Sequence, residues 1–113
     1  MKICVCGGGS LGHVCAGVLG SQEGVEINIL SGHPEKWRRE VTVTDENGKQ
    51  YIGNVNKVSS DAEVAVAGQD IILLCLPGYL IEKTLRDIKP FVGEAVVGTV
   101  VSSTGASSLL TIF

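Results

Sequence analysis

Residues 3–12 read ICVCGGGSLG, and this stretch decides the fold of the chain. A short apolar run, which predicts a buried strand over residues 2–6, leads directly into glycines with the G-x-G-x-x-G spacing at Gly7, Gly9 and Gly12. In such a loop the first glycine makes a tight turn, the second lets the backbone approach a pyrophosphate, and the third lets the next helix pack closely on the strand. We therefore predict that these glycines bind the phosphates of a dinucleotide.

A helix is expected to start inside this loop, because apolar residues recur at helical spacing along residues 11–19. The positions on this apolar stripe are Leu11, Val14, Cys15, Val18 and Leu19. Free N–H groups at a helix start attract phosphate, so Ser10 and Leu11 join the glycines as predicted cofactor contacts. A second strand is predicted over residues 25–30, which completes a β-α-β unit of the usual size.

The remainder of the chain alternates between predicted strands and helices. After the β-α-β unit we expect a short helix from Pro34 and a β-hairpin over 41–58 that turns at Asn47-Gly48. A helix opened by the capping-box residues 60–63 follows. The rest of the chain is expected to form a strand over 71–76, a helix over 79–88, a strand over 95–101 and a loop over 102–108. This pattern predicts an α/β fold of Rossmann type: a doubly wound, mostly parallel sheet with helices on both faces and an inserted β-hairpin. Residues 1–113 would form one dinucleotide-binding domain.

The composition narrows the class of partner and the compartment. The net charge of −3 does not favour nucleic acid, and no apolar run reaches the length of a membrane span, so neither partner is expected. The four cysteines, Cys4, Cys6, Cys15 and Cys75, lack the C-x-x-C spacing of metal and redox sites, so we predict free thiols and no metal. Free thiols fit a reducing compartment, which predicts a cytoplasmic location.

Ser31 bears on the choice between NAD and NADP. It lies nineteen residues after Gly12, at the end of the second predicted strand, where a site for NAD usually has an acid that binds the ribose 2′-hydroxyl. Ser31 has no carboxylate to repel a 2′-phosphate, and Lys36, Arg38 and Arg39 follow it. We predict NADP or NAD as the cofactor, with Arg38 as a contact that favours NADP. The alternative interpretation treats these cations as ordinary surface charges.

Two later segments are expected to complete the crevice at the carboxyl ends of the strands. Leu76 and Pro77 would flank the cofactor's ribose, and Ser102 would lie near the nicotinamide, although the segment after it also has the composition of a flexible linker. Two aromatic residues leave alternatives open. His13 either contacts the ligand or packs against the loop after Leu76, and Trp37 either stacks on an adenine or holds the short helix against the sheet.

These motifs together resemble the opine (octopine/nopaline) dehydrogenases, within the 6-phosphogluconate-dehydrogenase-like group. The similarity covers nearly the whole chain and rests on residues 6–13, on residues 35–37 with the hairpin after them, and on residues 67–77. It implies an enzyme that reductively condenses an amino acid with a 2-oxo acid, using NAD(P)H. Family members carry the catalytic histidine in a helical C-terminal domain, which is absent from this chain. We therefore predict no catalytic residue here, an inactive fragment, and substrates that bind through the missing domain; a homo-oligomer stays open.

Two other functions compete with this interpretation. The ketopantoate-reductase type shares the glycine loop but normally lacks the hairpin at Asn47-Gly48, so the hairpin favours the opine type. A non-catalytic dinucleotide-sensing domain, as in regulatory subunits of potassium channels, would have similar length. Such domains usually carry an acid where Ser31 stands.

Overall fold

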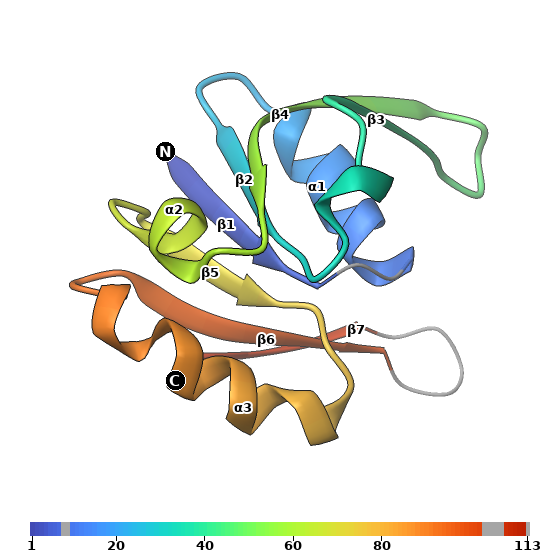
Figure 1. The fold of residues 1–113 in the computed structure, drawn as a ribbon. Coiled ribbons are helices and arrows are strands. Elements are labelled where there is room, and N and C mark those ends of the chain that lie inside the picture. Colours follow the sequence, from blue (N-terminus) through green and yellow to red (C-terminus); the bar gives the residue numbers. More distant parts are fainter. Residues whose placement is uncertain (8–9, 103–107, 113) are drawn as a thin grey trace.

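Seven strands form one sheet in the order β3-β4-β2-β1-β5-β6-β7, with helices against both of its faces (Figure 1). The computed structural model describes residues 1–7, 10–102 and 108–112. The strands are β1 (Lys2–Cys6), β2 (Glu26–Leu30), β3 (Glu40–Thr44), β4 (Gln50–Ser59), β5 (Ile71–Leu74), β6 (Val96–Ser102) and β7 (Ser108–Ile112). The helices are α1 (Ser10–Gly20), α2 (Ala62–Val66) and α3 (Gly78–Ile88), with the short 3₁₀ helices η1 (Pro34–Lys36) and η2 (Lys89–Phe91).

The chain starts in the middle of this sheet and winds outward on both sides. β1 pairs in parallel with β2 on one side and with β5 on the other. β4 and β6 extend the parallel core, because β4 pairs in parallel with β2 and β6 with β5. The order of the strands therefore reverses at β1, and in open α/β sheets ligands bind at such a switch point. The doubly wound, mostly parallel fold of Rossmann type is confirmed.

Alternate side chains of the central strands point to opposite faces of the sheet, and this divides the core in two. Ile3 and Val5 of β1 pack in the same cluster as Ala16 of α1, while Cys4 and Cys6 pack with residues of α2 and α3. In Figure 1, α1 accordingly covers one face and α2 and α3 cover the other. Burial on both faces explains why β1 is a continuous apolar run rather than an alternating one.

The buried face of α1 differs from the apolar stripe predicted from the sequence. Val14, a member of that stripe, is 45% exposed, whereas Ala16 is fully buried. Small residues line the buried face because α1 lies very close to β4: a Cβ atom added at Gly53 would lie 2.5 Å from the carbonyl oxygen of Ala16. The predicted stripe was wrong at Val14, whereas its members Cys15 and Leu19 do pack against the core. Ala16 was missed because the prediction ranked side chains by hydrophobicity, whereas this contact selects for small volume.

The predicted hairpin is present as β3 and β4, which pair antiparallel. Its turn is held by Asp45, whose Oδ1 accepts hydrogen bonds from the backbone N–H groups of Asn47 and Lys49, both at 2.9 Å. Beyond its antiparallel segment, β4 continues beside β2 in parallel along residues 55–59. The hairpin is thus inserted into the main sheet itself, and β4 links it to the strands that carry the site.

The later elements depart from the sequence prediction in two details. Asp61, and not Ser60, caps α2, since its Oδ1 accepts a hydrogen bond from the backbone N–H of Glu63 at 2.9 Å. The last strand, β7, was not predicted, and it pairs antiparallel with β6. The predicted apolar side of α3 does face the core, where Ile88 is fully buried. Within the described ranges, no helix combines the length and the apolar character that crossing a membrane requires.

Candidate dinucleotide-binding site

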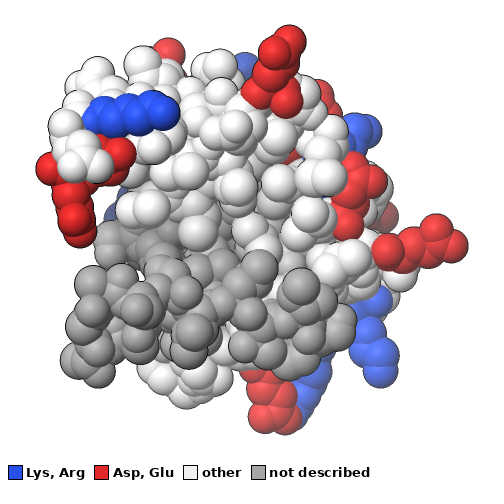
Figure 2. All heavy atoms as spheres, turned by 180° about the vertical axis from the view of Figure 1, so that it is seen from behind, with Lys and Arg blue, Asp and Glu red and all other residues white. Residues whose placement is uncertain are grey.

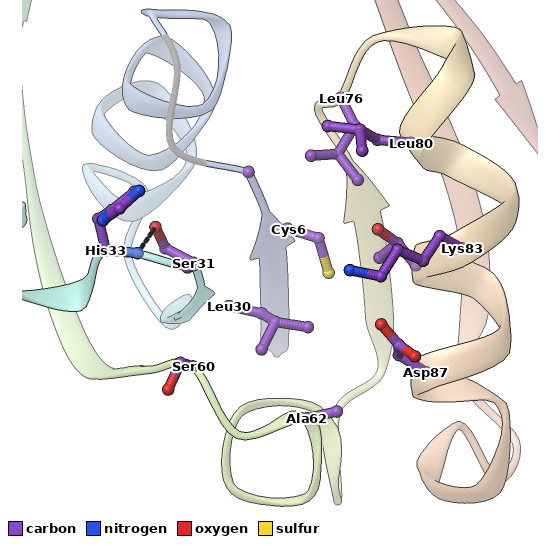
Figure 3. A pocket seen from close by; sticks show the side chains of 13 residues that line it. Cys6, Leu30, Ser31, His33, Ser60, Ala62, Leu76, Leu80, Lys83 and Asp87 are labelled. Carbon is purple, nitrogen blue, oxygen red and sulfur yellow. Dashed lines mark hydrogen bonds between the residues drawn. The ribbon is translucent and has the colours of Figure 1, made fainter.

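A pocket of about 370 Å³ opens at the carboxyl ends of β1, β2 and β5, at the switch point of the sheet (Figure 3). Its walls come from five segments: Cys6 and Gly7 at the end of β1, Leu30 to His33 at the end of β2, Ser60 and Ala62 at the start of α2, Leu76 after β5, and Leu80, Lys83, Thr84 and Asp87 of α3. The pocket therefore gathers residues far apart in the chain, and three of the predicted cofactor contacts, Gly7, Ser31 and Leu76, lie in it.

Gly7 makes the turn off β1 as the motif requires. Its φ of 138° is a conformation that side-chain-bearing residues rarely adopt, and a Cβ atom there would lie 2.4 Å from the carbonyl oxygen of Cys75. Gly12 is also in close contact, since its added Cβ would lie 3.2 Å from the carbonyl oxygen of Gly7. Glycine at these two positions therefore lets the turn after β1 pass close to the main chain at Cys75 and lets α1 pack against the turn, as the motif requires. Gly9 and the side chains of Ser10 and Leu11 lie outside the described residues.

Ser31 is buried at the floor of the pocket, with 5% of its surface exposed. Its backbone N–H donates to the carbonyl oxygen of Ser59 at 3.0 Å, and its Oγ accepts a hydrogen bond from the backbone N–H of His33 at 3.1 Å. Figure 3 shows this second bond within the turn that follows β2. A hydroxyl that accepts in this way keeps its proton for donation, so Ser31 can donate to a ribose hydroxyl or a phosphate oxygen.

The basic side chain that faces the pocket is not Lys36, Arg38 or Arg39, the three that follow Ser31 in the sequence. Lys83 points into the pocket from α3, one helical turn before Asp87 (Figure 3). Arg38 and Lys36 instead line a separate hollow together with His13, and Arg39 lines a third one. The structure thus does not bring Arg38 together with Ser31. Lys83 was missed because its position on α3 gives no sign of which strand ends it faces.

The remaining predicted contacts lie at the rim of the site or outside the part that can be described. Pro77 is exposed and forms the N-cap of α3, next to the pocket residue Leu76. Ser102 is the last residue of β6, where its backbone pairs with Ser108, and its side chain lies outside the described residues. Residues 103–107, predicted as part of a loop, also lie outside them.

His13 and Trp37 form a stacked pair beside the site. Their ring centroids are 3.8 Å apart and their planes 4° from parallel. Trp37 is 8% exposed, belongs to the core on the α1 side of the sheet, and ends η1, which confirms that it holds this short helix in place. The imidazole of His13 thus packs on the indole of Trp37, and the two alternatives for His13, contact with the ligand or packing against the loop after Leu76, stay predictions.

Charged side chains are distributed without a single-sign concentration on the face shown in Figure 2. There, acidic and basic residues alternate around the rim, and the middle of the described surface is uncharged. This distribution does not produce the strong one-sign field that attracts a polyelectrolyte.

Comparison with known proteins places this geometry among dehydrogenases. Octopine dehydrogenase of Pecten maximus is 28% identical over 109 residues, which are 86% of this chain but 27% of that enzyme. The chain therefore spans about a quarter of the length of the curated relatives it matches. The resemblance to opine dehydrogenases that the motifs predicted is confirmed by this similarity.

Solved structures lead to the same fold. A structure of octopine dehydrogenase with NADH and pyruvate superposes with a TM-score of 0.78 at 28% identity, covering 85% of this chain and 28% of that one. A 2-dehydropantoate 2-reductase from Porphyromonas gingivalis superposes with a TM-score of 0.66 at 20% identity, covering 99% of this chain and 51% of that one, and shows the fold alone.

A protein-family model matches most of the chain. The model described as ketopantoate reductase PanE/ApbA matches residues 3–106. This match includes the glycine turn, the hairpin, α3 and β6. The chain therefore belongs to the ketopantoate reductase PanE/ApbA family.

Proposed function

We propose that this chain is the dinucleotide-binding domain of an NAD(P)-dependent oxidoreductase. The observation that carries the proposal is the pocket at the switch point, where the Gly7 turn and the buried hydroxyl of Ser31 meet the apolar side chains of Leu30, Leu76 and Leu80. Apolar walls with a few convergent polar groups suit the adenosine half of a dinucleotide. The superposed octopine dehydrogenase, solved with NADH, supports the same assignment.

Each part of the pocket has a task that its chemistry allows. The glycine turn provides backbone N–H groups and space for the pyrophosphate, Ser31 donates to the ribose, and the leucines cover the faces of the adenine. When bound, the reduced nicotinamide supplies a hydride to the substrate. In this proposal the residues of this chain bind and orient the cofactor.

The reaction that fits the relatives best is the reductive condensation of an amino acid with a 2-oxo acid. Support comes from the octopine, opine and tauropine dehydrogenases among the matches, which this chain covers over about a quarter of their length. In this proposal a further, C-terminal domain contributes the catalytic residues and the substrate pocket. The four free thiols support a reducing, cytoplasmic setting for the enzyme.

A reduction of the ketopantoate-reductase type is the second candidate, and the family match favours it. The two candidates differ in the species that is reduced. An opine enzyme reduces the condensation product of two substrates, so the 2-oxo acid alone should not consume cofactor. A ketopantoate-type enzyme reduces the oxo acid directly.

Calorimetric titration of NADH and NADPH into the chain tests the proposal, with Gly12→Val and Gly78→Ala as matched variants. A side chain at Gly12 would press on the Gly7 carbonyl and weaken binding by at least about tenfold, whereas Gly78 has open space around its Cβ position and should tolerate alanine. Circular dichroism checks that both variants fold. Absence of dinucleotide binding by the folded wild-type chain would overturn the proposal. Turnover by the 113-residue chain itself would overturn the need for a further domain.

A further inference from the structure

Two cysteines from distant parts of the chain meet on the α1 side of the sheet. The Sγ atoms of Cys15, on α1, and Cys75, directly after β5, are 3.6 Å apart, with the Cys75 thiol donating to Cys15. A disulfide needs an Sγ–Sγ distance of about 2.05 Å, so the two sulfur atoms must approach by roughly 1.5 Å. Rotation of two side chains that are already in contact can provide such a movement.

The two thiols differ in a way that suits stepwise oxidation. The hydrogen bond that Cys15 accepts from Cys75 lowers the pKa of the Cys15 thiol, whereas the same bond and burial raise the pKa of Cys75. Cys15 is also half-buried, while Cys75 is 5% exposed. Oxidants attack the thiolate, so Cys15 is the sulfur that reacts first and Cys75 is the one that resolves the product.

We propose that Cys15 and Cys75 form a redox modification site that a peroxide converts into a reversible disulfide. In the first step the Cys15 thiolate attacks a peroxide oxygen, the O–O bond breaks, and a sulfenic acid and hydroxide form. In the second step Cys75 attacks the Cys15 sulfur, the S–O bond breaks, and water leaves. Two thiols and one hydrogen peroxide thus give one disulfide and two waters.

The other two cysteines do not compete for the same oxidant. Cys4 and Cys6 are 0% and 1% exposed and lie on the opposite face of β1, in the core beneath α2 and α3. A hydrogen bond with Cys4 and burial raise the pKa of Cys6. Neither thiol therefore has the access of Cys15, and the raised pKa of Cys6 also makes its thiolate scarcer.

Tryptic mapping after peroxide treatment of the whole chain tests the site. Cleavage after lysine leaves Cys4, Cys6 and Cys15 on the peptide 3–36 and Cys75 on the peptide 58–83, so the disulfide appears as a cross-link between them. The expected product is a cross-linked species whose mass is two hydrogens below the summed masses of the two peptides. Dithiothreitol should reduce it to the two separate peptides. The inference is overturned if no cross-link has formed when glutathione in the same solution is fully oxidised.

Four single variants assign the sulfur atoms. Cys4→Ala and Cys6→Ala should both retain the cross-link, and Cys15→Ala should abolish it. In Cys75→Ala the Cys15 sulfenic acid lacks its resolving thiol, so dimedone should label the peptide 3–36 after peroxide treatment. A cross-link that survives in folded Cys15→Ala would show that another cysteine is the partner of Cys75. Because no nucleotide is involved, the result does not depend on the proposed function.

Discussion

The imidazole of His13 stacks on the indole of Trp37 with ring centroids 3.8 Å apart. This contact joins the first turn of α1, which follows the glycine loop, to the segment that follows η1. On its other side, η1 follows the turn of Ser31 and His33, which forms one wall of the pocket. The stack therefore holds α1 against the short helix η1, which directly follows the pocket residues Ser31 to His33.

Removing this stack should destabilise the domain. We expect Trp37→Ala to lower the free energy of unfolding by about 3 kcal/mol, because a buried indole is lost, and His13→Ala to lower it by about 1 kcal/mol. Urea denaturation measures both, and the double variant should show a coupling of about 1 kcal/mol. His33→Ala is the control: its ring is 70% exposed, so stability should not change. Equal effects at the two histidines would contradict the role of the stack.

The close contact between α1 and β4 predicts that Gly53 tolerates no side chain. In Gly53→Ala the new Cβ would lie 2.5 Å from the Ala16 carbonyl oxygen, and the separation of α1 from the sheet should reduce the free energy of unfolding by about 1–3 kcal/mol. The midpoint of denaturation by urea is the measurement. Gly78→Ala, with no atom within 4 Å of its Cβ position, should leave the midpoint unchanged or raise it. A neutral Gly53→Ala would mean that α1 lies farther from β4.

Lys83 and Arg38 are the two candidate partners of the cofactor's 2′-phosphate, and each leads to a different prediction. If Lys83 binds this phosphate, Lys83→Ala should weaken NADPH binding roughly fivefold and leave NADH unaffected, since an exposed charge pair contributes about 1 kcal/mol. Arg38→Ala should show this selective loss only if the segment after η1 moves toward the pocket on binding. Titration of both cofactors at low and high salt distinguishes the two, and Lys89→Ala controls for overall charge. Equal loss for NADH and NADPH in Lys83→Ala would rule out the phosphate contact.

The cap of α2 should contribute measurably to stability. Asp61→Ala removes the oxygen that accepts from the Glu63 N–H and should cost about 1 kcal/mol, whereas Asp61→Asn keeps an acceptor and should cost less. Ser60→Ala is the matched control, because the structure assigns the cap to Asp61. A larger loss at Ser60 than at Asp61 would restore the capping box expected from the sequence. Thermal unfolding of the three variants gives the comparison.

The sequence was sufficient for the parts of the fold that local patterns determine. The strand 2–6, the turn at Gly7 and the second strand follow from hydrophobicity and backbone freedom within thirty residues, and all three are present. The cap of α2 was displaced by one residue because Ser60 and Asp61 are both good N-caps, and only the backbone path selects between them.

Long-range contacts account for what the sequence could not predict. Ala16 is buried and Val14 is exposed because α1 packs against β4 at Gly53, which lies 37 residues after Ala16 in the sequence. The helical spacing of apolar residues within α1 carries no information about so distant a contact. Lys83 faces the pocket because α3, which follows β5, lines the pocket together with residues from the ends of β1 and β2. Arg38 lies in another hollow because Trp37, next to it, turns inward against His13.

The contact between Gly7 and the backbone at position 75 has a consequence for genetics. The atom that an alanine at Gly7 would strike is a carbonyl oxygen, which is present whatever side chain occupies position 75. No substitution of Cys75 can therefore compensate a Gly7→Ala lesion by making room. Suppressors of such an allele should revert Gly7 itself or shift the main chain that follows β5, for example at Pro77, and allele-specific suppressors at the touching residue should not arise.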